Sequence, residues 1–195
     1  MLIFALLAAL CGGCVNRVTQ PVELVRPVTI YIADSGGKHS SLLLPDKAAA
    51  AGSEGYVHYA FGDWRCFALN KNGPLDYLRA AVASDRSALG REHLPTTRPD
   101  ELRRLTAADL VPVVVEDADV SLLRRQLEAR FANGEAEAVD NRTVRMTLVP
   151  LDDGPNRRYS IFNQCNTMTS RWLRRLNCAS PRTALLGRFE VAAGE

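Results

Sequence analysis

The sequence lacks the features of several common functional classes. Its net charge is only +2 over 195 residues, and its basic residues occur in short arginine pairs that are typical of solvated helix faces. We therefore expect no nucleic-acid partner. No stretch has the spacing of a phosphate-binding glycine loop, a serine-hydrolase elbow or a structural zinc site. We accordingly expect neither a cofactor nor a metal ion, and the chain has no internal repeat.

No transmembrane segment is expected either, because the apolar run at residues 1–10 is too short to cross a bilayer comfortably. The run is followed by small residues and Cys14, a pattern typical of a bacterial lipoprotein signal. Residues 1–14 thus predict an exported protein whose Cys14 carries the lipid that binds it to a membrane. The alternatives are an uncleaved anchor and a soluble secreted form. Residues 15–27, with two prolines, predict a tether, and residues 28–190 predict one domain.

Cysteine is scarce beyond the signal, where only Cys66, Cys165 and Cys178 occur. An exported protein meets oxidising conditions, so two of these thiols are candidates for a disulfide. Three cysteines cannot all pair within one chain. A Cys66–Cys178 bridge is one possibility, and it would leave Cys165 as a free thiol.

The hydrophobic pattern predicts an α+β fold with an antiparallel sheet and a late helix packed on it. Strands are expected at 28–34, 39–45 and 56–62, side by side in one sheet. Amphipathic helices are expected over 73–85, with Leu75, Leu78, Ala81 and Val82 on one face, and over 118–134, with Leu123, Leu127 and Phe131 in register. Around His93 we expect a loop, and Asp34 and Asp63 are expected to be turn residues.

The late helix begins near Cys165, in the stretch "NQCNTMTSRWL", with Asn163 as the expected cap. Met168, Trp172, Leu173 and Leu176 form the stripe that we expect to be buried. Cys165 shares this face, so burial alone would explain it. Its position in the first helical turn also favours a thiolate, because the unpaired N–H groups and the helix dipole lower a thiol pKa there. Both interpretations, core residue and nucleophile, stay open at this stage.

Histidine is scarcer still, with only His39, His58 and His93 in the chain. A nucleophilic thiol needs a base within hydrogen-bond reach and a group that orients this base. His39 opens a predicted strand after a Gly-Gly turn, and His58 lies within the next strand. These two side chains are therefore candidates for the base and the orienting group. The alternative for His58 is an ordinary half-buried sheet residue.

Three stretches, "IYIADSGGKHSSLLLP", "YVHYAFGDW" and "YSIFNQCNTMTSRWLRRL", together resemble an uncharacterised bacterial family of secreted, often lipoprotein-like proteins. That family is in turn similar to circularly permuted papain-like hydrolases, the NlpC-related group that includes lecithin:retinol acyltransferase-like enzymes. The resemblance implies a permuted papain-like fold, with Cys165 as nucleophile, His39 as base and His58 as the polar orienting residue. The chain departs from the family pattern at Phe61, Cys66 and Met168.

The activity implied is acyl transfer from an amide or ester through a Cys–His pair, in a hydrolase or an acyltransferase. The expected location is the bacterial cell envelope, as an outer-membrane lipoprotein facing the periplasm, where peptidoglycan or lipid are the possible substrates. The alternative is a non-catalytic lipoprotein that serves as a binding or scaffolding domain.

Overall fold

A computed structural model describes residues 15–46, 54–151, 157–185 and 188–192. The expected lipoprotein signal, including Cys14, lies outside the described residues. Within them, no helix combines the length and the apolar character needed to cross a membrane.

The main sheet has seven strands in the order β6-β2-β3-β4-β5-β8-β7, and every neighbouring pair is antiparallel. The α+β class and the adjacency of the first three predicted strands are thereby confirmed. The strands are β2 (Pro27–Ser35), β3 (His39–Asp46), β4 (Gly55–Asp63), β5 (Ser87–Leu94), β6 (Asp109–Glu116), β7 (Val139–Asn141) and β8 (Met146–Leu151).

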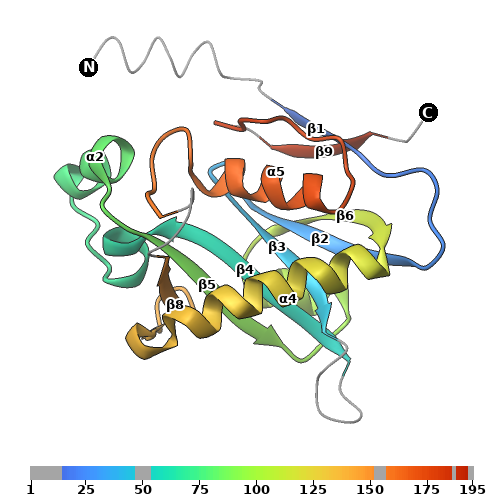
Figure 1. Cartoon of the computed structure of the whole chain (residues 1–195), viewed down its shortest axis with the longest axis horizontal. Helices are drawn as coiled ribbons and strands as arrows, with labels where there is room; N and C mark the ends of the chain where they lie inside the picture. Colours follow the sequence, from blue (N-terminus) through green and yellow to red (C-terminus); the bar gives the residue numbers. More distant parts are fainter. Residues whose placement is uncertain (1–14, 47–53, 152–156, 186–187, 193–195) are drawn as a thin grey trace.

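Two helices cover one face of this sheet, namely α4 (Asp117–Gly134) and α5 (Cys165–Arg175) (Figure 1). The predicted periodicity of both is confirmed, because their apolar residues join one core with inward side chains of the central strands. Burial of each large apolar side chain stabilises the fold by about 1.5–3 kcal/mol. The helix residues concerned are Leu123, Leu127 and Phe131 of α4, then Met168, Trp172 and Leu173 of α5, with Leu176 at its end.

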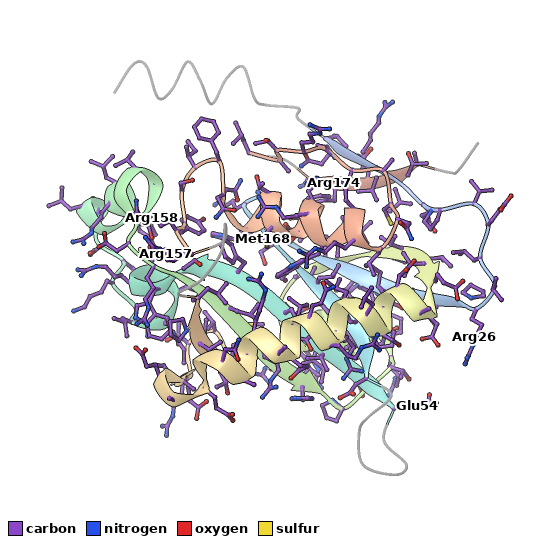
Figure 2. The ribbon with its side chains drawn as sticks, in the orientation of Figure 1. Arg26, Glu54, Arg157, Arg158, Met168 and Arg174 are labelled. Carbon is purple, nitrogen blue, oxygen red and sulfur yellow. The ribbon has the colours of Figure 1, made fainter. Side chains whose placement is uncertain are left out.

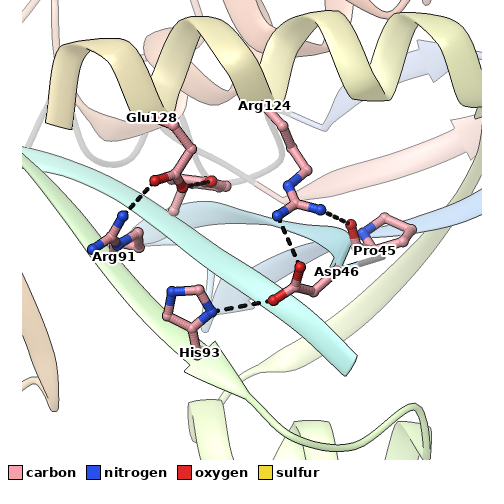
Figure 3. A network of polar contacts seen from close by, with 7 residues as sticks. Pro45, Asp46, Arg91, His93, Arg124 and Glu128 are labelled. Carbon is pink, nitrogen blue, oxygen red and sulfur yellow. Dashed lines mark hydrogen bonds and ion pairs between the residues drawn. The ribbon is translucent and has the colours of Figure 1, made fainter. Parts of the chain in front are cut away.

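Polar contacts also fasten α4 to the sheet (Figure 3). The guanidinium of Arg124 donates to the carbonyl of Pro45 and to the carboxylate of Asp46, both at 2.9 Å. The same carboxylate lies 3.2 Å from Nδ1 of His93. Glu128, one turn further along α4, accepts hydrogen bonds from Tyr59 and Arg91. These contacts hold α4 against β3, β4 and β5.

Smaller elements cover the opposite face of the sheet. Helix α3 (Pro99–Thr106) packs there through Leu102, and the π-helix η1 (Trp64–Ala68) packs through Phe67 and Ala68. Asp63, predicted as a turn residue, is the last residue of β4 and caps η1 by accepting the N–H of Cys66 at 2.8 Å. A short 3-10 helix, η2 (Glu135–Glu137), follows α4.

A second, two-stranded sheet pairs β1 (Asn16–Thr19) with β9 (Phe189–Ala192) in parallel. Val18 of β1 is fully buried. The tether predicted for residues 15–27 is therefore wrong, because its first part pairs with β9. Its second part is bound to β6: the side chain of Gln20 accepts the N–H of Val114 at 2.8 Å, and Glu116 accepts those of Val25 and Arg26.

One further prediction is also wrong. His93 lies in β5, not in a loop, because the strand is held between β4 and β8 and so needs little apolar sequence of its own. Helix α2 (Pro74–Ala83) forms where expected, but Leu75, Leu78 and Val82 on its apolar face are exposed by 81, 54 and 72%. Among the α2 residues whose burial the structure describes, Ala80 is the buried one.

Candidate functional site

Helix α5 begins at Cys165, and its cap is Gln164 instead of the predicted Asn163. The Oε1 atom of Gln164 accepts the backbone N–H of Asn166 at 2.9 Å. Its amide nitrogen donates to the carbonyls of Ala184 and Leu185, at 2.7 and 2.6 Å. Because Gln164 is buried and uses both ends of its side chain, it fixes the start of α5 against the segment at residues 184–185.

The β2–β3 hairpin brings His39 to this helix start. Gly36 and Gly37 take positive φ angles of 65° and 72° in the turn, and the carboxylate of Asp34 accepts the N–H of Gly37 at 2.6 Å. Asp34, predicted as a turn residue, lies in β2, and its side chain stabilises the turn that follows. His39 begins β3, and its Nδ1 lies 3.4 Å from Sγ of Cys165. The structure therefore brings together the two residues predicted as base and nucleophile.

The strands leave room for α5 at this end of the sheet. Pairing between β3 and β4 runs from Leu42 to Asp46, so the first residues of β3 lie beyond it. The N-terminus of α5 occupies this position, where Asn166 donates to the carbonyl of Lys38 at 3.5 Å. The backbone N–H of Ser40 also points to the thiol. Because β4 is not paired with the first residues of β3, the first turn of α5 can contact His39.

Tyr159 completes the immediate surroundings of the thiol. Its ring stacks on Phe61 at 5.8 Å between centroids, and its hydroxyl contacts Cys165. Burial, and then the nearby Cys165, raise the pKa of the Tyr159 hydroxyl, which therefore stays a proton donor at neutral pH. Tyr159 and Asn166 both border the thiol. Asn163 instead donates to the carbonyl of Arg158 at 2.6 Å.

The electrostatics differ from the sequence-based expectation. Burial raises the pKa of the Cys165 thiol, although the N–H groups of Ser40 and Asn166 and the Tyr159 hydroxyl oppose this. The thiol is only 5% exposed, so desolvation exceeds the effect of the helix start. Burial, followed by the charge of Lys38, lowers the pKa of His39, even though part of the residue reaches solvent. Near neutral pH the pair is therefore a neutral thiol beside a neutral imidazole, not an ion pair.

His58 does not join this pair. It is paired in register with Leu43 and Glu92, on the sheet face opposite to α5. Its Nε2 lies 2.7 Å from Oγ of Ser41, and its Nδ1 lies 3.5 Å from Glu92 without hydrogen-bond alignment. His58 is therefore not in a position to orient the imidazole of His39. The reason is position along the sheet, because His58 lies opposite Leu43, four residues along β3 from His39, and its Nε2 contacts Ser41.

Cys66 and Cys178 are free thiols, so the possible Cys66–Cys178 bridge is absent from the described part of the chain. Cys66 belongs to η1 and Cys178 to the core under α5, which are on opposite faces of the sheet. Burial raises the pKa of each thiol to about 12. Neither is therefore a competing nucleophile at neutral pH.

The sequence did not single out Gln164 and Ser40. A glutamine directly before the first helical residue is a detectable cap signal, whereas the Ser40 N–H depends on where two strands separate. No group of three or more His, Cys, Asp or Glu side chains in the described ranges has the geometry to hold a metal ion. Comparison with known proteins gave no match to a protein family, a curated protein or a solved structure.

Proposed function

We propose that this protein is a cell-envelope thiol enzyme that transfers an acyl group from an amide or ester through a thioester on Cys165. The observation that carries the proposal is the 3.4 Å contact between Sγ of Cys165 and Nδ1 of His39 at the start of α5. A permuted papain-like arrangement, in which the histidine strand precedes the cysteine helix, is part of the proposal.

The neutral state of the pair fits a general-base mechanism. Nδ1 of His39 accepts the thiol proton while Sγ attacks the substrate carbonyl and the C–S bond forms. The imidazolium then returns this proton to the leaving amine or alcohol. In the second half, water or another acceptor attacks the thioester and gives a proton to His39. The C–S bond breaks, and His39 passes this proton to the sulfur, which restores the Cys165 thiol. A positioned base typically contributes about 10²–10⁴-fold to the rate.

The carbonyl oxygen of the substrate gains negative charge when the sulfur attacks, and a hydrogen-bond donor must stabilise this charge. The first turn of α5 offers backbone N–H groups and the positive end of the helix dipole, beside the N–H of Ser40. A donor of this kind is worth about 3–4 kcal/mol in other enzymes. Tyr159 is a second candidate donor, because its pKa is raised and its hydroxyl already contacts the sulfur.

The lipoprotein signal supports an outer-membrane location facing the periplasm, where peptidoglycan peptides and lipids contain amides and esters. Cys14 would hold the protein there. A second candidate function is a non-catalytic binding or scaffolding domain. One observation favours it, namely that Cys165 is 5% exposed and its pKa is raised by burial.

Acylation of the purified chain by an activated ester, p-nitrophenyl acetate, distinguishes the two functions. We expect a thioester at Cys165, located by peptide mass spectrometry, and slower formation in His39→Ala by roughly 10²-fold or more. Cys165→Ser should accumulate no thioester. Cys66→Ser is the matched control, because its thiol is accessible but has no histidine base, and it should behave as wild type. Equal rates in wild type and His39→Ala would favour the binding domain.

A further inference from the structure

Apolar side chains gather on the surface beside the candidate site. We call the apolar face a set of five exposed residues contributed by α2 and by the segment that leads into α5. Within α2, the three residues Leu75, Leu78 and Val82 recur at helical spacing, so they line one side of the helix. The full set is Leu75, Leu78, Val82, Ile161 and Phe162.

The two parts of the apolar face are joined. The N–H of Ile161 donates to the carbonyl of Ala81 in α2 at 3.0 Å. Phe162, which is 68% exposed, follows directly. An amphipathic helix in a soluble domain normally buries its apolar side, whereas α2 turns this side outward. Contiguous exposed apolar residues of this kind mark a contact with a protein or a membrane.

The surrounding charge favours an anionic surface as the partner. The acidic residues of the α2 region are already paired, Asp76 with Arg65 and Asp85 with Arg79. Arg157 and Arg158, both labelled in Figure 2, are exposed, and the carbonyl of Arg157 accepts the N–H of Ser87, four residues after the end of α2. In the described residues around this face, the acidic side chains are paired, and Arg157 and Arg158 add two positive charges. Exposed apolar residues with adjacent cations are typical of segments that lie in the headgroup region of anionic membranes.

The start of the chain also points to a bilayer. The apolar run at residues 1–10 and Cys14 precede β1, and Val15 alone separates Cys14 from Asn16, the first residue of this strand. A residue spans at most about 3.6 Å, so a membrane anchor at Cys14 would hold the domain directly against the bilayer. In Figure 1, β1, the segment leading into α5 and α2 all lie toward the same side of the molecule.

From these observations we infer that the apolar face, with Arg157 and Arg158, rests in the headgroup region of a bilayer that contains anionic lipid. The inference does not depend on the chemistry of Cys165. It adds to the predicted lipid anchor a contact made by the folded domain itself. Because Phe162 precedes Cys165 by three positions, such a contact would border the candidate site.

Fluorescence quenching tests this contact on the full chain, in vesicles of phosphatidylcholine and phosphatidylglycerol with brominated acyl chains. Phe162→Trp places a probe in the apolar face. Val25→Trp is the matched control, because Val25 is 89% exposed but adjoins Arg26 at the other end of the molecule (Figure 2). After subtraction of the signal from the native tryptophans, we expect at least half of the Phe162→Trp emission, and little of the Val25→Trp emission, to be quenched.

Two further variants test the cause of the quenching. In the Phe162→Trp background, the exposed changes Leu78→Glu and Val82→Glu should lower the quenching at least twofold without loss of helical circular dichroism. Arg157→Glu with Arg158→Glu should lower it in vesicles that contain phosphatidylglycerol. Equal quenching of both probes, or none at Phe162→Trp, would overturn the inference and leave the anchor as the only contact. A blue shift of the Phe162→Trp probe that depends on protein concentration in vesicle-free solution would also overturn it, in favour of a second copy of the chain.

Discussion

The sulfur of Cys165 lies 3.4 Å from Nδ1 of His39, although 126 positions separate the two residues in the chain. Burial raises the pKa of the thiol and lowers that of the imidazole, so the pair holds its proton on sulfur near neutral pH. The neutral imidazole of His39 can then accept this proton. At low pH the imidazole is itself protonated, and the reaction should slow for that reason.

The pH dependence of Cys165 acylation should reflect His39. Only neutral His39 accepts a proton, and its pKa is below the ordinary value of 6.5, so the rate should fall on acidification with a midpoint below pH 6.5. Lys38→Met should move this midpoint to higher pH, because the charge of Lys38 contributes to the lowered pKa. Rates of thioester formation between pH 4 and 8 measure both effects.

Lys71→Met serves as the control for that measurement, since Lys71 is an exposed lysine in the segment between η1 and α2. Its midpoint should equal that of the wild type. A rate that keeps rising up to pH 8 in all three proteins, with no midpoint below pH 6.5, would mean that the thiol ionises without help from His39.

Gln164→Ala should destabilise the domain by about 2–3 kcal/mol. The variant removes the cap of α5 and the two hydrogen bonds to Ala184 and Leu185, all at a buried position. Urea unfolding followed by circular dichroism gives this difference. Gln126→Ala is the same substitution at an exposed position of α4, where the glutamine contacts Arg175, and should cost less than about 0.5 kcal/mol. Similar losses in both variants would contradict the role assigned to Gln164.

Arg124→Met should lower the free energy of unfolding by about 3 kcal/mol. It removes the guanidinium beside the buried carboxylate of Asp46, and loss of one partner from a buried ion pair is more damaging than loss of both. The double variant Arg124→Met/Asp46→Leu should therefore be more stable than the sum of the single changes predicts. Arg125→Met, at the exposed neighbouring position, should change stability by less than about 0.5 kcal/mol. Strictly additive losses would argue against coupling between Arg124 and Asp46.

Labelling of cells with a radioactive fatty acid tests the anchor. The wild-type chain should become labelled and Cys14→Ser should not, because the predicted signal has Cys14 as its only acceptor. Cys11→Ser, two glycines upstream, is the control and should keep its label. Label in both Cys14→Ser and wild type, or in neither, would contradict the prediction.

The sequence predicted well where a segment's own residues determine its structure. The β2–β3 hairpin has apolar strands joined by Gly36 and Gly37, and α4 keeps its apolar residues at helical spacing over its whole length. The same holds for the start of α5 near Cys165. His39 and Cys165 were predicted as a pair, and their contact follows from the hairpin and this helix.

The failures concern relations between distant segments. No local pattern tells that Glu92 lies opposite His58 on the face away from α5, or that β1 pairs with β9. Periodicity indicates that α2 has an apolar side, but it does not indicate whether this side faces the core or the solvent. The raised pKa of Cys165 also depends on packing by strands and loops that its helix does not contain.

The pairing of β1 with β9 has a consequence for the order of folding. Asn16 and Phe189 are partners in register, so the strand that is synthesised early cannot complete its sheet until almost the whole chain is present. Contacts between residues so far apart in sequence form slowly, because a long loop must close first. The small sheet should therefore assemble last, and shortening the chain before Phe189 would leave β1 without its partner while the seven-stranded sheet keeps all of its strands.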